Sequence, residues 1–310
     1  MTGILNVVLP VFLVIGAGYV AALFRLFSSQ HVDGLMRFTQ TFAIPCLLFS
    51  AISTLDLGQD FEVTLLGTYY TGSTVVFLTG ALGARFVFGR PAPDAIAIGF
   101  ACFFGNSLLL GLAISEQAFG SSALAPNYAI IAIHAPFCYI VGITAMEIVR
   151  ASGGGIFHTV AQVLKAVFSN SLMIGIGLGF VVNLTGFPMP AVTTQAIDLI
   201  ARAALPAALF GMGGVLFQYR PEGDLKEVAL VCLCALVLHP GIVWGLAHSV
   251  SDLTTGQLRG AIVTAAMAPG VNAYVFANMY GVAKRVAATS VLLGTAASVL
   301  TASVWLSILP

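Results

Sequence analysis

The chain has 310 residues, of which 59% are hydrophobic and only 8% are charged. A soluble domain carries about 25% charged residues, so this composition excludes a protein that faces water on every side and indicates an integral membrane protein. The formal net charge is zero and the chain holds no basic tract, so no nucleic-acid partner is expected.

Apolar residues gather in ten stretches along the chain. A helix of about 20 apolar residues crosses a hydrocarbon core about 30 Å thick, and each stretch reaches that length. The sequence therefore predicts an all-α integral membrane protein with ten transmembrane helices. In chain order these are expected at residues 3–24, 32–53, 61–88, 95–118, 126–149, 160–183, 191–217, 225–248, 257–280 and 286–308.

Basic residues predict the orientation of these helices. Ten of the twelve Lys and Arg residues flank the odd-numbered connections, and only Arg202 and Arg259 do not. By the positive-inside rule, these connections are cytoplasmic. The chain is therefore expected to cross the cell (inner) membrane with both termini on the outer side. The ten residues are Arg25, Arg37, Arg85, Arg90, Arg150, Lys165, Arg220, Lys226, Lys284 and Arg285.

The predicted helices divide evenly between the two halves of the chain. Because five is an odd number, the second half has to run opposite to the first, which predicts inverted repeats. The first repeat is expected at residues 1–149 and the second at residues 160–310. Between them, residues 150–159 contain Ser-Gly-Gly-Gly and are expected to form a flexible cytoplasmic linker.

A short motif occurs once in each half. Ala-Ile-Pro-Cys-Leu-Leu-Phe-Ser at 43–50 returns as Ala-Leu-Pro-Ala-Ala-Leu-Phe-Gly at 204–211. Pro45 and Pro206 each remove a helix hydrogen bond, which predicts one kink in each half. Repeated kinked or broken helices in two hydrophobic halves are typical of membrane transporters.

Two mid-span segments combine glycine with asparagine. The fourth span contains Phe-Gly-Asn-Ser-Leu-Leu-Leu-Gly-Leu-Ala at 104–113, and the ninth contains Ala-Pro-Gly-Val-Asn-Ala at 268–273. Glycine and proline loosen a helix, so we expect both spans to be broken. Backbone N–H groups at the start of a half-helix carry partial positive charge, which suits a carboxylate. The alternative is that these residues only allow close helix packing.

These motifs resemble the auxin efflux carrier family. The resemblance rests on residues 105–114, on the Pro-x-x-Leu-Phe copies that begin at Pro45 and Pro206, and on Tyr-Val-Phe-Ala at 274–277. It implies a sodium/proton antiporter-like fold in which the broken fourth and ninth helices cross. It also implies a scaffold of helices one, two, six and seven, a transport domain of helices three to five and eight to ten, elevator-type movement and a homodimer.

The same resemblance suggests substrate-binding residues. Asn106 matches an asparagine that faces substrate, Tyr139 matches a binding-site tyrosine, and His134 stands where the plant carriers have glutamine. The plant carriers place proline at each crossing, where this chain has Ala113 and Ala273, so an auxin-type substrate is not implied. The full candidate set is Asn106, Gly111, Ala113, His134, Tyr139, Asn272 and Ala273.

Ionisable residues inside the spans are few. His134 is expected to bind an anion when protonated or to carry a coupled proton, and the alternative is a neutral, hydrogen-bonded histidine. His239 is expected to be structural. So is the pair of Asp198 and Arg202, because residues four apart face one another along a helix. No acidic residue falls near the centre of the fourth, fifth or ninth span, so sodium coupling is not expected.

Other functional classes lack the motifs they need. The sequence has neither His-Glu-x-x-His nor an aspartate-rich Mg²⁺ motif, so an intramembrane enzyme is not expected. Gly-Ile-Gly-Leu-Gly at 175–179 follows no strand and predicts close helix approach rather than dinucleotide binding. The five cysteines lie in apolar spans and are predicted to be buried, and no metal or other cofactor is expected.

Taken together, these features predict a secondary transporter of a small organic anion, a carboxylate or weak organic acid. The alternative is a passive anion channel, which would need a continuous polar lining. An inside-negative potential drives an anion outward, so import would need protons as a coupling partner. The substrate and the direction of transport stay open at this level.

Overall fold

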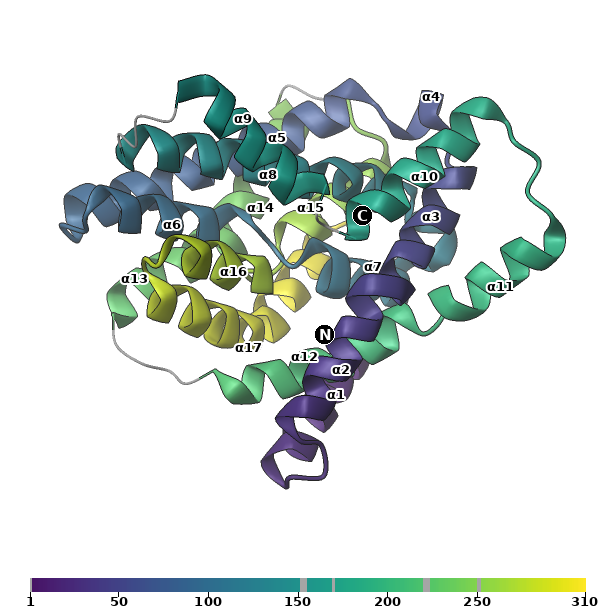
Figure 1. Cartoon of the computed structure of the whole chain (residues 1–310), viewed down its shortest axis with the longest axis horizontal. Helices are drawn as coiled ribbons and strands as arrows, with labels where there is room; N and C mark the ends of the chain where they lie inside the picture. The colour runs from purple at the N-terminus through teal and green to yellow at the C-terminus, as the bar shows by residue number, and fades with distance from the viewer. Residues whose placement is uncertain (1, 151–154, 169–170, 220–223, 250–251) are drawn as a thin grey trace. The chain divides into compact units, whose positions relative to one another are not determined.

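The computed structural model describes residues 2–150, 155–168, 171–219, 224–249 and 252–310. Within these ranges every regular element is a helix and no strand is present (Figure 1). The predicted all-helical class is therefore confirmed. Of the expected linker, residues 151–154 lie outside the described ranges, as does Arg220.

The described helices form two compact units, a smaller one and a larger one. The smaller unit comprises residues 10–61 and 165–218. It contains most of α1 (Thr2–Leu23), followed by α2 (Ser29–Phe38), the π-helix η1 (Thr39–Ala43), α3 (Ile44–Thr54), α4 (Leu57–Asp60), α10 (Ser171–Thr185), α11 (Ala191–Ala201) and α12 (Ala204–Gln218).

Glycines bring α10 close to α3 in the smaller unit. A Cβ atom at Gly175 would lie 2.7 Å from Cα of Pro45, and one at Gly179 would lie 2.9 Å from Cβ of Ile52. Any larger residue would push the helices apart, so the predicted close approach at 175–179 is confirmed. The Asn183 amide strengthens the contact by donating to the Ile52 carbonyl at 2.9 Å.

The larger unit comprises residues 1–9, 62–164 and 219–310. Its described elements are α5 (Val63–Leu82), the π-helix η2 (Gly83–Val87), α6 (Ala92–Phe103), the π-helix η3 (Ser107–Gly111), α7 (Leu112–Phe119), the 3₁₀ turn η4 (Ser121–Ala123), α8 (Ala125–Arg150), most of α9 (Gly155–Phe168), α13 (Leu225–Leu233), the π-helix η5 (Cys234–Leu238), α14 (His239–Ser249), α15 (Thr255–Ala265), α16 (Val271–Tyr280) and α17 (Lys284–Ile308).

A hydrophobic core joins α5, α8, α14 and α15 in the larger unit. It includes the buried side chains of Leu65, Tyr69, Ile130, Val243 and Ile262. Lipid tails are as apolar as these side chains, so the core contributes tight packing more than removal from water. This packing fixes the middle of α5 against α8 and α14, where several buried polar groups lie.

The described helices account for each of the ten predicted apolar stretches, either singly or as two or three consecutive elements. The chain is therefore a multi-pass membrane protein, while the count of ten and the inverted arrangement stay predictions. Six helical stretches are long and apolar enough to cross a membrane, namely Asn6–Leu23, Ser29–Thr54, Ala125–Arg150, Ala191–Gln218, Leu225–Ser249 and Lys284–Ile308.

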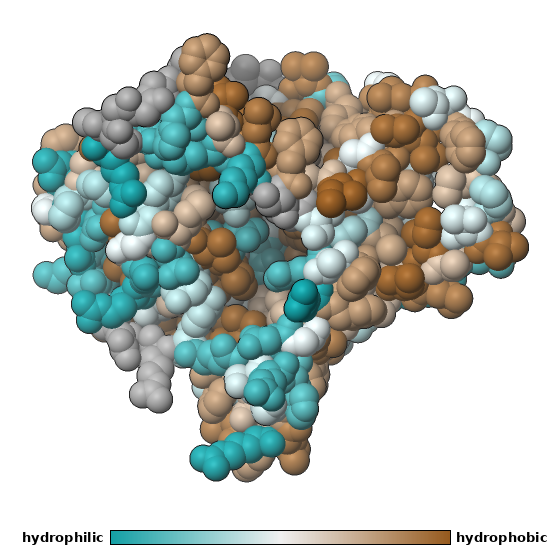
Figure 2. All heavy atoms as spheres, viewed as in Figure 1, coloured by the Kyte–Doolittle hydropathy of each residue, from teal (hydrophilic) through white to brown (hydrophobic). Residues whose placement is uncertain are grey.

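Large apolar side chains are exposed on the surface of the smaller unit. Hydrophobic residues cover α10 and α11 in Figure 2, and Leu184, Val192 and Leu199 are among the exposed ones. Soluble proteins rarely expose apolar patches of this kind, whereas a surface that faces lipid is expected to be apolar. The surface therefore agrees with a membrane location.

The two motif prolines have different local structures. Pro45 follows the π-helix η1, and the chain stays helical from Ser29 to Thr54. Pro206 instead follows a two-residue turn at 202–203 that separates α11 from α12. Proline leaves the carbonyl group four residues earlier without its helical donor, and a widened turn or a short break both accommodate this loss.

Candidate functional site

Two helix interruptions meet in the larger unit. Residues 104–106 separate α6 from η3, and residues 266–270 separate α15 from α16. Gly105 and Pro269 form an isolated antiparallel β-bridge between the two interruptions. The interruptions that the glycine, proline and asparagine residues predicted are therefore present, and they are in direct contact.

Two backbone hydrogen bonds hold the interruptions together. The Asn106 N–H donates to the Ala268 carbonyl at 2.7 Å, and the Gly270 N–H donates to the Phe104 carbonyl at 2.8 Å. Backbone groups in hydrocarbon have to be satisfied within the protein, and this short ladder does so where the helices stop. The ladder fixes the starting points of η3 and α16 relative to one another.

Each interruption is followed by a new helix N-terminus. Asn106 caps η3, because its side-chain oxygen accepts from the Leu109 N–H at 3.4 Å. Gly270 precedes α16, and its carbonyl accepts from the Ala273 N–H at 2.9 Å. The first N–H groups of a helix lack intrahelical partners and carry partial positive charge. Two such termini side by side favour a negative group at this place.

Phe104 brings three of the predicted residues together. Its ring centroid lies 5.1 Å from that of His134 and 5.7 Å from that of Tyr139, both on α8. Asn106 follows Phe104 by two residues, and all three candidates are buried. Sequence reasoning missed Phe104, although an aromatic residue directly before the Gly-Asn break was a usable signal.

The other four predicted residues lie close to the same interruptions. A Cβ atom at Gly111 would lie 3.4 Å from Cγ of Met267, so Gly111 lets η3 pack closely against the second interruption. Ala113 and Ala273 are buried in the first turns of α7 and α16, and Asn272 is half-buried. Binding of substrate by these four residues stays a prediction.

An aromatic stack lies beside the crossing. The rings of Phe100 on α6 and Phe276 on α16 are 3.8 Å apart between centroids, and their planes differ by 4°. Gly142 of α8 faces both rings, and a Cβ atom there would lie 2.7 Å from Cε2 of Phe100. The stack therefore joins three helices through a position that admits only glycine.

His239 lies in a buried polar cluster. Its Nε2 atom is 3.2 Å from the Ser73 hydroxyl, and its ring centroid is 5.0 Å from that of Tyr69. The Tyr69 ring centroid is in turn 6.0 Å from that of His134. The hydrogen bond to Ser73 agrees with the structural role expected for His239, and the contribution of Tyr69 was not foreseen. Its signal was the adjacent tyrosine pair at 69–70.

A buried amide joins α7, α8 and α15. The Asn127 side chain donates to the Ser115 hydroxyl at 3.0 Å, the Thr264 hydroxyl at 2.9 Å and the Gly260 carbonyl at 3.4 Å. An amide in hydrocarbon needs such partners, and interhelical hydrogen bonds of this kind hold membrane helices together. Sequence reasoning missed this network, although an asparagine near the start of an apolar span was visible.

Asp198 and Arg202 do not form the predicted pair. The Asp198 carboxylate accepts a hydrogen bond from the Ser50 hydroxyl at 2.7 Å. The salt bridges of the described residues include neither Asp198 nor Arg202. The Arg202 N–H still donates to the Asp198 carbonyl at 3.0 Å, one helical turn away. The prediction was wrong about the side chain, because the Asp198 carboxylate bonds to Ser50 on α3 instead of to the Arg202 guanidinium.

An ion-pair cluster joins the start of α6 to the start of α13. Arg90 contacts the Asp224 carboxylate at 2.6 Å and the Glu227 carboxylate at 2.7 Å. The hydrogen bond to Glu227 raises the pKa of the Arg90 guanidinium, so this residue stays charged. Glu227 is buried and therefore depends on Arg90 as its counter-charge.

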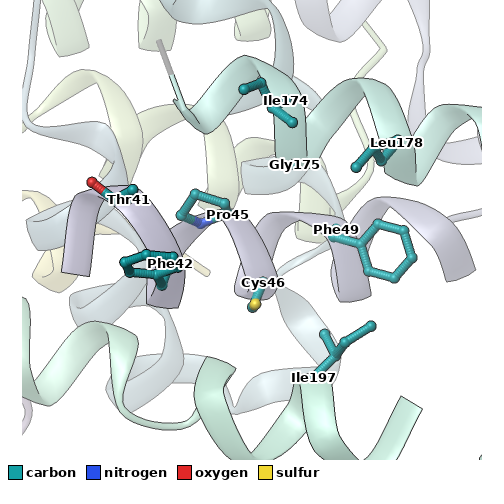
Figure 3. A pocket seen from close by; sticks show the side chains of 9 residues that line it. All are labelled: Thr41, Phe42, Pro45, Cys46, Phe49, Ile174, Gly175, Leu178 and Ile197. Atoms are coloured by element: carbon teal, nitrogen blue, oxygen red, sulfur yellow. The ribbon is translucent and has the colours of Figure 1, made fainter. Parts of the chain in front are cut away.

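A pocket of about 310 Å³ lies in the smaller unit (Figure 3). None of the seven candidate residues lines it, so this pocket is not part of the candidate site. Within the described ranges, no group of three His, Cys, Asp or Glu residues could hold a metal ion. The pocket is lined by Thr41, Phe42, Pro45, Cys46, Phe49, Ile174, Gly175, Leu178 and Ile197.

Comparison with known proteins shows which family the chain belongs to. A family model described as membrane transport protein matches residues 4–306. The chain belongs to this family. It is the family of the auxin efflux carriers, so the resemblance in the motifs is confirmed. Membership makes the protein a membrane transporter and not an enzyme.

Two relatives match this chain over nearly its full length. A Rhizobium meliloti (strain 1021) protein named "Putative malonate transporter" is 28% identical over 317 residues, covering 97% of this chain and 94% of the relative. The Escherichia coli (strain K12) protein named "Uncharacterized transporter YfdV" is 21% identical over 313 residues, covering 99% of this chain and 98% of the relative.

Proposed function

We propose that this membrane transporter carries a small organic anion whose carboxylate binds where the two interrupted helices meet. The observation that carries the proposal is the pair of helix N-termini that follow residues 104–106 and 266–270, held together by backbone hydrogen bonds. Partial positive charge at both termini attracts one negative group without a fixed cation. A carboxylate fits because its two oxygens can accept from both termini.

The substrate-binding residues we propose surround this point. Asn106, His134 and Tyr139 lie around Phe104, and Asn272 begins the opposite half-helix. Gly111, Ala113 and Ala273 complete the set as small residues that leave room for backbone approach. In this arrangement the amide and hydroxyl groups bind the polar part of the substrate, and Phe104 limits its size.

The distribution of buried polar groups supports separate roles for the two units. All buried polar and charged side chains of the described chain lie in the larger unit, except Thr39. Buried polar residues are costly in a membrane and mark substrate or ion paths. We therefore assign the larger unit as the transport domain and the smaller unit as the scaffold of an elevator-type homodimer. Ten spans in two inverted repeats are part of this proposal.

Malonate is the first substrate to test. The named activity of the Rhizobium meliloti relative suggests a short dicarboxylate, and 28% identity extends over almost the whole chain. One carboxylate would bind at the paired N-termini. The second would then need a further positive or hydrogen-bonding group, for which Asn106 and His134 are the nearest candidates.

The test is malonate counterflow in proteoliposomes. Vesicles loaded with unlabelled malonate should accumulate labelled malonate in a saturable way, whereas a passive channel would only equilibrate it. Asn106→Ala should abolish accumulation while folded protein is retained. Asn278→Ala removes an equivalent amide from the exposed face of α16 and should leave transport intact. Undiminished counterflow in Asn106→Ala would refute the assigned site.

A further inference from the structure

We propose that His134 and His239, which both contact Tyr69, hold a single proton inside the larger unit and bind it together with the anion. The proposal rests on the proposed anion transport and adds a coupling partner to it. It also gives His239 a role beyond the structural one expected from the sequence. The proton comes from water and forms one N–H bond on one imidazole, while the substrate is chemically unchanged.

The three side chains form one buried cluster. His134 is 4% exposed, His239 is 3% exposed and Tyr69 is fully buried. The Tyr69 ring contacts both imidazoles, with centroid distances of 5.0 Å to His239 and 6.0 Å to His134. Within the described chain the Tyr69 hydroxyl forms no hydrogen bond of regular geometry, although the Ser107 side chain of η3 lies near it. A buried hydroxyl of this kind is available to a ligand or a water molecule.

Local structure places His239 in this cluster. The π-helix η5 ends at Leu238, directly before His239, and π-helical turns occur frequently at functional sites. Gly72 of α5 lets α14 approach, because a Cβ atom there would lie 3.2 Å from Cδ2 of His239. One turn from Gly72 along α5 the ring of Tyr69 packs against His239, and Ser73 holds its Nε2 atom. The position of the imidazole is thus fixed by backbone and side chains together.

Within the described ranges, no carboxylate is among the groups that contact His134 or His239. The titratable groups that face the histidines are Tyr69 and Tyr70 from α5 and Cys138 from α8. Helix α15 meets α14 through apolar side chains, and Trp305 of α17 packs against the same core. The salt bridges of the described residues include neither histidine. A protonated imidazole would therefore contact uncharged groups, namely the Ser73 hydroxyl, the Cys138 thiol and aromatic rings. Aromatic rings attract a cation within about 6 Å of the ring centroid.

Two consequences follow for charge. Two imidazolium groups in contact with the same ring repel each other in an apolar site, so the pair holds one proton and not two. A single buried cation without a counter-ion is unfavourable, and an anion at the helix interruption would supply the missing charge. His134 is placed for this, since its ring centroid is 5.1 Å from that of Phe104 at the interruption. Anion binding then favours proton binding, and the reverse holds by linkage.

Calorimetry of malonate binding tests this coupling. Titrations in buffers of different ionisation enthalpy give the number of protons taken up, and we expect about one per malonate where the pair is unprotonated before binding; no proton uptake at any pH would overturn the proposal. His134→Gln and His239→Gln should each displace the pH dependence of proton uptake. The double variant should take up no proton when it binds malonate. His248→Gln is the matched control, because His248 is exposed and bonded to the Trp244 carbonyl. The proposed histidine pair is overturned if the double variant still takes up a proton, or if His239→Gln leaves the pH dependence of proton uptake unchanged.

A second measurement does not depend on the substrate. Nuclear magnetic resonance of ¹⁵N-labelled histidine follows the protonation of each imidazole in the purified full-length protein. We expect the titration midpoint of His134 to change when His239 is replaced by Gln. The midpoint of His239 should likewise change when His134 is replaced by Gln. Independent titrations would refute the shared proton. If the protein binds no organic acid, the proposed function fails, while these titrations still decide the proposal.

Discussion

Replacing Gly142 by Ala tests whether the aromatic stack at the crossing is rigid. The added Cβ atom would lie 2.7 Å from Cε2 of Phe100 and 3.1 Å from Cε2 of Phe276. Ordinary contacts of this atom type begin at about 3.4 Å, so both rings would have to retreat. Phe100 cannot easily do so, because it also packs against Phe103, Phe104 and Tyr139.

The size of the effect follows from two opposing terms. Overpacking a well-packed interior costs up to about 3 kcal/mol, and the absence of free space around Phe100 places Gly142→Ala near that limit. Alanine returns up to about 1 kcal/mol through better helix propensity. The net loss is about 2 kcal/mol. Gly67→Ala is the matched control, since Gly67 lies on an exposed face of α5 with no atom within 4 Å of an added Cβ.

Thermal unfolding of the purified protein measures both variants. A loss of about 2 kcal/mol corresponds to a decrease in Tm of roughly 3 °C for a chain of this size, and Gly67→Ala should leave Tm equal or slightly higher. Malonate counterflow should also fall in Gly142→Ala, because the stack joins α6 and α16 on either side of the proposed site. If Gly142→Ala unfolds at the wild-type temperature, the rings are not locked and the reasoning fails.

Three further substitutions test other contacts. Arg90→Gln should lower Tm by several degrees, because it leaves Glu227 buried without a counter-charge, and added Glu227→Gln should restore part of the loss. Asn127→Leu should lower Tm by removing three interhelical hydrogen bonds; an unchanged Tm would show that the network contributes nothing. Trp305→Phe should cost about 1 kcal/mol by leaving the Leu236 carbonyl without its donor, and equal stability would contradict this role.

The helix interruptions could be predicted because their causes are local. Glycine and proline weaken a helix wherever they stand, so the segments at 104–106 and 266–270 were recognisable from the sequence. Their direct contact through Gly105 and Pro269 depends on residues more than 160 positions apart. Spacing along the chain carries no information about that contact, which came only from the resemblance to a family.

The charged residues show where sequence reasoning stopped. Asp198 and Arg202 keep the spacing of a helical pair, because the Arg202 N–H donates to the Asp198 carbonyl, yet the Asp198 side chain bonds to Ser50 instead. Pro206 marks the end of α11 at Ala201, because it removes the donor to the Arg202 carbonyl. Nothing in the sequence identifies Ser50 as the partner of Asp198, since the two residues are 148 positions apart. His239 likewise gave no signal of its own, because its neighbours Ser73 and Tyr69 lie on a different helix.

Three prolines illustrate why a kink is easier to predict than its structure. Each one leaves a carbonyl group without its helical N–H donor, four residues earlier. At Pro240 that carbonyl belongs to Leu236, and the Trp305 indole N–H donates to it at 2.9 Å. At Pro45 a π-helical turn precedes the proline, and at Pro206 a two-residue turn does. In every case the sequence shows which carbonyl group loses its N–H donor. What satisfies that carbonyl depends on the side chains and backbone groups that pack beside it. A donor from α17 lets α14 continue directly after a π-helical turn, and His239 consequently keeps a defined position beside Tyr69 at the centre of the proposed proton site.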